Sequence, residues 1–192
     1  MELSWTHVHL LFNHFPIVGA IGGLLLLIYA LFKDSEDLKQ AASLVFFLIA
    51  LISILVFYGG VQAEEVVEQL PRVPHSLIHA HRKVAEQALI ALEILGVMSL
   101  FWLLLFRGAK RTPTWFTPLL LVIAVVATVF VSWAGLQGGI IRHTEVRGEF
   151  SFLLPKDAAE AGGHEHGGAE TKHEQSGQSG HEHSQESGHS HE

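Results

Sequence analysis

Four long apolar segments precede a polar C-terminal tail. The segments run over about residues 5–32, 41–62, 75–106 and 116–142. Each is long enough to cross a bilayer as a helix, for which about 20 apolar residues are needed. Because backbone groups in the bilayer core must be paired within the protein, four such segments predict an all-α integral membrane four-helix bundle over residues 1–155.

The composition agrees with a small membrane protein. Hydrophobic residues make up 49% of the 192 residues and charged residues only 16%, which is too apolar for an ordinary soluble domain. No basic patch interleaved with aromatic residues is present, so nucleic acid is not an expected partner. The chain has no cysteine, which excludes disulfides, thiolate metal sites, iron–sulfur clusters and covalent haem attachment.

The first apolar segment opens with three histidines. His7, His9 and His14 are followed by Pro16, which removes one backbone hydrogen bond and predicts a kink beside His14. A histidine in a membrane helix is costly unless it faces the bundle interior and has a function. Neither lysine nor arginine precedes this segment and it lacks an Ala-x-Ala site, so we do not expect it to be a cleaved signal peptide.

Titratable side chains also interrupt the third segment. His75 and His79 share a face, whereas His81 points about 160° away from His79. Glu86 and Glu93 continue the His79 stripe at intervals of seven residues. Glu93 falls near mid-membrane, where a carboxylate must be paired, neutral or beside water. It either belongs to a proton path with Glu86 or bonds to a neighbouring helix.

Four spans place both chain ends and the connection between the second and third segments on one side of the membrane. All seven histidines outside the tail belong to that side. The loop at residues 107–111 lies on the opposite side and has three basic residues and no acid. This charge pattern favours a cytoplasmic location for the loop, so we expect the histidines and the tail to be extracytoplasmic.

Histidines from facing helices of a bundle are a recurrent means of holding haem, because two imidazoles supply both axial ligands. His14 from the first segment and His79 or His81 from the third form the expected pair. His9 and His143 lie near the interface and would form a second pair or ligate a metal. The alternative for any one of these residues is an interfacial or hydrogen-bonded core histidine.

Charged residues near the same rim allow two interpretations. Arg82 and Arg142 suit haem propionates or a quinone oxygen, or are interfacial charges whose stems lie along the apolar surface. Carboxylates would complete a non-haem metal site with the histidines, and the candidates are Glu64, Glu65 and Glu145. Otherwise Glu64 and Glu65 are expected to form a solvated face with Glu68.

The tail, residues 156–192, is rich in Gly, Ser, Gln, Glu and His, which predicts disorder. Its seven histidines are His164, His166, His173, His181, His183, His189 and His191. His-x-His repeats of this kind bind Zn²⁺, Ni²⁺ or Cu²⁺ weakly and promiscuously. The tail therefore either buffers or delivers metal, or only increases solubility.

Three motifs carry a resemblance to a known family. The first is Val8-His9-Leu10-Leu11-Phe12-Asn13-His14-Phe15-Pro16-Ile17, the second is Gly59-Gly60 followed by His81, and the third is Gly138-Gly139-Ile140-Ile141-Arg142-His143. Over about residues 5–150 the chain resembles the bacterial four-helix membrane family named domain of unknown function 2231. It departs from that family at Thr144-Glu145, where a glycine-containing turn is usual.

The resemblance implies which histidines matter. It gives His9, His14, His81 and His143 as the family-type positions and thereby favours His81 over His79. Members of the family are found joined to cytochrome c modules, which implies a membrane redox role.

We therefore expect a b-type haem protein of the bacterial cytoplasmic membrane that passes electrons between a quinone or a partner cytochrome and the outer face. Two alternatives from other classes stay open. One is a membrane protein that handles Zn²⁺, Ni²⁺ or Cu²⁺ received from the tail. The other is a non-catalytic subunit of a larger membrane redox complex or oligomer. The sequence assigns no catalytic residue.

Overall fold

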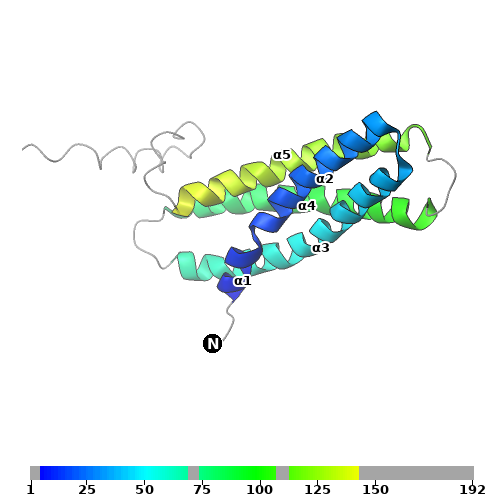
Figure 1. The fold of residues 1–192 in the computed structure, drawn as a ribbon. Coiled ribbons are helices and arrows are strands. Elements are labelled where there is room, and N and C mark those ends of the chain that lie inside the picture. Colours follow the sequence, from blue (N-terminus) through cyan, green and yellow to red (C-terminus); the bar gives the residue numbers. More distant parts are fainter. Residues whose placement is uncertain (1–4, 69–73, 107–112, 143–192) are drawn as a thin grey trace, which may run out of the picture.

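The computed structural model describes residues 5–68, 74–106 and 113–142, which form four membrane spans (Figure 1). The helices are α1 (Trp5–Phe12), α2 (His14–Lys33), α3 (Glu36–Val67), α4 (His75–Leu105) and α5 (Phe116–Arg142). Helices α1 and α2 share the first span, and all four spans are long and apolar enough to cross a membrane. The described residues contain no strand. The expected all-α four-helix bundle is confirmed, and the chain is a multi-pass membrane protein.

The first span is interrupted at Asn13, between α1 and α2. Pro16 has no N–H to give to the carbonyl of Phe12, and its ring crowds that carbonyl. The N–H of Asn13 still donates to the carbonyl oxygen of His9 at 2.9 Å, so the interruption is local. The kink expected beside His14 is therefore present. As a result α1 leaves the line of α2 and packs mainly against α3 (Figure 1).

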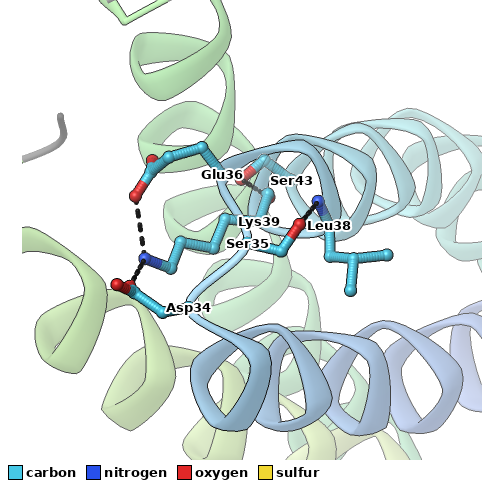
Figure 2. A network of polar contacts seen from close by, with 6 residues as sticks. All are labelled: Asp34, Ser35, Glu36, Leu38, Lys39 and Ser43. Atoms are coloured by element: carbon cyan, nitrogen blue, oxygen red, sulfur yellow. Dashed lines mark hydrogen bonds and ion pairs between the residues drawn. The ribbon is translucent and has the colours of Figure 1, made fainter. Parts of the chain in front are cut away.

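The turn between α2 and α3 explains why α3 begins at Glu36 and not near residue 41. Ser35 caps the helix, its Oγ accepting a hydrogen bond from the N–H of Leu38 at 3.4 Å. The ammonium of Lys39 lies 2.8 Å from Glu36 Oε1 and 3.3 Å from Asp34 Oδ1 (Figure 2). Cap and ion pairs together stabilise the first turn of α3 ahead of its apolar part.

The spans pack in a ring in which α3 and α5 each contact both α2 and α4. Glycines allow close approach: Gly23 of α2 receives the ring of Phe46, and Gly96 of α4 receives Ala50. The buried core runs along the bundle axis and includes Ala20, Leu27, Phe46, Leu92, Leu95, Leu120 and Ala124. The opposite faces of all four spans are apolar and exposed, as contact with lipid requires.

Candidate functional site

His9 of α1 is fixed against α3 by one hydrogen bond and one glycine. Its Nδ1 lies 2.8 Å from the carbonyl oxygen of Val56. The imidazole covers Gly60, where an added Cβ would stand 3.0 Å from both Cε1 and Nδ1. At Gly59 an added Cβ would stand 3.1 Å from the carbonyl oxygen of Trp5. The Gly59-Gly60 pair therefore lets α1 approach α3 closely and leaves room for the ring of His9.

His81 of α4 repeats this arrangement against α5. Its Nδ1 lies 3.1 Å from the carbonyl oxygen of Ala134. The imidazole covers Gly138, where an added Cβ would stand 3.2 Å from Cε1 and 3.6 Å from Nδ1. Each of the two histidines thus packs on a glycine of the neighbouring helix and is paired with a backbone carbonyl one turn away from that glycine.

Both rings lie on faces that look into the bundle. Val84, Ala88 and Leu95 follow His81 by about one, two and four helical turns, respectively, and all three are buried. The four residues therefore share one face of α4. Gly60, which carries the ring of His9, is on the face of α3 that includes the buried residue Ala63. His9 lies near the start of α1 and His81 near the start of α4. Spans one and three therefore each place one imidazole at the same end of the bundle, here called the histidine end.

The backbone contacts define the chemical state of the two rings. A carbonyl oxygen only accepts hydrogen bonds, so Nδ1 of His9 and Nδ1 of His81 are the protonated donors. In a neutral imidazole Nε2 is then the free acceptor. Histidines that ligate metals in proteins are held in this way, with the other ring nitrogen donating to a carbonyl or carboxylate. His9 and His81 each present Nε2 in the form that an iron ion requires.

The remaining candidate histidines occupy other positions. His14 on α2 and His79 on α4 are exposed, whereas the rings of His9 and His81 are each hydrogen-bonded to a neighbouring helix. His143 and the seven histidines of the tail lie outside the described residues. Arg142 ends α5, and its side chain also lies outside the described part.

Arg82, next to His81 in sequence, connects two spans at the histidine end. Its Nη1 lies 3.0 Å from Glu64 Oε2 of α3, and its Nε lies 3.2 Å from Glu86 Oε1. The side chain of Glu64 is only 12% exposed, so the expectation of a solvated face is wrong for this residue. Arg82 holds the carboxylate of Glu64 against the bundle. Glu65 and Glu68 are exposed as expected. Glu145, the third carboxylate considered for a metal, lies outside the described residues.

Glu93 forms a hydrogen bond between two helices within the membrane. Its Oε1 lies 3.1 Å from Ser53 Oγ of α3, which in turn lies 2.7 Å from the carbonyl oxygen of Ala50. A hydroxyl has one proton, so Ser53 shares that proton between the two oxygens. Glu86 is exposed and bonds to Arg82, so the two carboxylates of the stripe have different partners. The bond to a neighbouring helix is present, and the proton path stays a prediction.

The donor groups described at the histidine end are the two imidazoles of His9 and His81. Within residues 5–68, 74–106 and 113–142, no group of three or more His, Cys, Asp or Glu side chains is arranged to hold a metal ion. A zinc site takes three or four ligands from the protein. A haem takes only the axial ligands, and two imidazoles are a sufficient set. His9 and His81 would supply this pair of imidazoles if a haem were bound at the histidine end.

Sequence reasoning missed the partners that hold these two rings. Val56 and Ala134 contribute backbone carbonyls, and a carbonyl leaves no signal in the residue type. Gly60 and Gly138 were noticed as parts of motifs, without a reason for glycine at those positions. The reason is the close approach of one imidazole to each glycine.

Comparison with known proteins gave no match among family models, curated proteins or solved structures. The resemblance to the bacterial four-helix membrane family thus stays an expectation drawn from the three motifs.

Proposed function

We propose that the protein is a b-type haem protein of the bacterial cytoplasmic membrane that transfers electrons, with His9 and His81 as the axial ligands. One observation carries the proposal: both imidazoles place Nδ1 on a backbone carbonyl and the ring on a glycine, at the same end of the bundle. Second-shell bonds of this kind set the tautomer and orientation of a ligating histidine. The same features recur on two unrelated helix pairs, α1 with α3 and α4 with α5.

A haem bound at this place would supply one-electron oxidation and reduction. The chain's own residues would do the rest. The carbonyls of Val56 and Ala134 keep the proton on Nδ1 and make Nε2 more basic, which favours the oxidised, more positively charged iron. Apolar side chains of the four spans exclude water from the interior of the bundle.

The place of the site in the bundle suggests the electron partners. His9 and His81 lie within two turns of the starts of α1 and α4, and therefore near a membrane surface. A quinone in the bilayer or a cytochrome outside it would reach that depth. The loop at residues 107–111 has three basic residues and connects the ends of α4 and α5 that lie away from the histidines. Its charge supports the proposal that the histidine end faces away from the cytoplasm.

The test is the visible spectrum of the full chain, produced with an adequate haem supply and purified in detergent. We expect a Soret band, reduced-minus-oxidised α and β bands, and a stoichiometric haem content by the pyridine haemochrome assay. His9→Ala and His81→Ala remove the haem, whereas His14→Ala and His79→Ala, which alter exposed histidines, retain it. Circular dichroism checks that the variants fold.

Two results would overturn the proposal. A colourless parent protein with four intact helices would assign His9 and His81 a structural role, as clamps between helices in a non-catalytic subunit. A haem that is lost on His14→Ala and retained on His9→Ala would place the ligands elsewhere.

A further inference from the structure

We propose that His75 and His79 form a separate, exposed site for a divalent late transition metal ion. The two residues lie one turn apart at the start of α4 and both are exposed. Within the described residues neither imidazole takes part in a hydrogen bond or an ion pair. The site uses none of the residues assigned above to haem, so it stands or falls independently of the proposed function.

The spacing of the pair is the one that chelation on a helix requires. Side chains four residues apart are neighbours on one face, with Cβ atoms about 5–6 Å apart. Two histidines at this spacing bind one zinc ion in the His-Glu-x-x-His motif. Here the sequence is His75-Ser76-Leu77-Ile78-His79, with the same interval and no carboxylate between. Imidazole nitrogen is a preferred donor for Cu²⁺, Ni²⁺ and Zn²⁺.

Three positive groups lie near the pair: the N-terminus of α4, Arg82, and the exposed Lys83 four residues after His79. The N-terminus of α4 and the neighbouring Arg82 both oppose a positive ion. The guanidinium of Arg82, however, is turned to two carboxylates, Glu64 at 3.0 Å and Glu86 at 3.2 Å. The two negative charges of Glu64 and Glu86 offset the positive charge of Arg82. A cation bound by His75 and His79 would therefore meet little net repulsion from Arg82.

Because only two protein side chains bind the metal ion, the site exchanges the ion and does not retain it permanently. The other coordination positions of the ion are left to water or to an incoming donor, and exposure on the outer face of α4 gives free access. The chain leaves α5 at the same end of the bundle at which α4 begins (Figure 1). The tail, with seven histidines, follows α5 in the sequence, and in this proposal it is the donor from which the pair receives an ion.

The experiment distinguishes metal binding by His75 and His79 from metal binding by the tail. It does so by substituting the tail histidines and not by truncating the chain. In the full-length parent, all seven tail histidines are changed to serine, and Cu²⁺ is added in steps while the electron paramagnetic resonance spectrum is recorded. We expect one bound Cu²⁺ with the hyperfine pattern of two equatorial imidazole nitrogens. His75→Ala and His79→Ala each reduce this to one nitrogen and weaken binding about 10²-fold, because the second imidazole no longer acts intramolecularly.

The matched control is His14→Ala, which removes an exposed imidazole that has no histidine four residues away. It leaves both the affinity and the two-nitrogen spectrum unchanged. The substitutions at His75 and His79 alter exposed side chains, so folding is expected to persist and is checked by circular dichroism. A parent that binds no Cu²⁺, or variants that keep the two-nitrogen spectrum, would overturn the proposal.

Discussion

His9 and Gly60 touch across α1 and α3, so closely that a Cβ on residue 60 would stand 3.0 Å from two atoms of the imidazole. His81 and Gly138 stand in the same relation across α4 and α5, with a corresponding distance of 3.2 Å. The two glycines have no functional group, yet they determine where the rings lie. They are therefore positioning residues of the proposed haem site.

This relation predicts the effect of adding one methyl group. Gly60→Ala and Gly138→Ala push the imidazoles away from the carbonyls of Val56 and Ala134 and should weaken haem binding by about 10–100-fold, the range found when second-shell support is lost. Gly139→Ala is the matched control, since an added Cβ there meets no atom within 4 Å. Haem titration of the apoprotein measures all three. Equal affinities across the set would show that the glycines do not support the site.

A second pair of glycine variants tests the helix packing. A Cβ at Gly96 would overlap the side chain of Ala50 on α3, so Gly96→Ala should destabilise the bundle by about 1–3 kcal/mol. Gly22→Ala meets no atom within 4 Å and should stabilise its helix by about 0.5–1 kcal/mol. Unfolding in mixed micelles measures the two. If Gly96→Ala proves neutral, α3 and α4 are farther apart than described.

Trp102 offers a variant that removes a buried polar group together with part of a buried ring. Its ring packs against Phe116 and Phe106 at 5.1 and 5.7 Å between centroids, and its buried Nε1 has no hydrogen-bond partner in the described part of the chain. In Trp102→Phe the gain from removing an unpaired N–H offsets part of the cost of the smaller ring, so the loss of stability should stay below about 2 kcal/mol. Trp102→Ala should lower the stability by about 3–5 kcal/mol. A loss in the phenylalanine variant as large as that in the alanine variant would contradict the description of an unpaired N–H.

The bond between Ser53 and Glu93 predicts unequal effects of changing its two ends. Ser53→Ala leaves the carboxyl group of Glu93 without its partner on α3 and should cost about 0.5–2 kcal/mol, as hydrogen bonds between membrane helices do. Glu93→Gln keeps an acceptor oxygen at the same position and should have the smaller effect. Thermal unfolding of both variants in one detergent makes the comparison. Equal losses would point to a role for the charge or proton of Glu93 beyond this bond.

The spans could be predicted from the sequence because lipid demands long apolar helices. Helices α4 and α5 begin at the expected residues 75 and 116, and the interruption of the first span follows from Pro16. The bounds of α3 were missed by about five residues at each end. Capping by Ser35 extends its start. At the other end, α3 continues past the apolar run to Val67, and Glu64 in this added turn forms an ion pair with Arg82 of α4.

The site was only half predictable. From the sequence, only the family resemblance favours His81 over His79. The structure adds that His81 shares a helical face with the buried residues Val84, Ala88 and Leu95. The choice between His9 and His14 could not be made in this way. It depends on the change of direction at Asn13, which turns α1 toward α3 and places His9 on Gly60. That contact is between two helices, and the helical spacing of apolar residues in the sequence does not predict it.

We propose above all that the imidazoles of His9 and His81 are the two axial ligands of one haem. Low-temperature electron paramagnetic resonance of the oxidised full chain tests it most directly, because two axial imidazoles make ferric haem low-spin. We expect a low-spin signal in the parent protein that becomes high-spin or disappears in both His9→Ala and His81→Ala. A low-spin signal that survives both substitutions, or a parent protein without haem, would contradict the account.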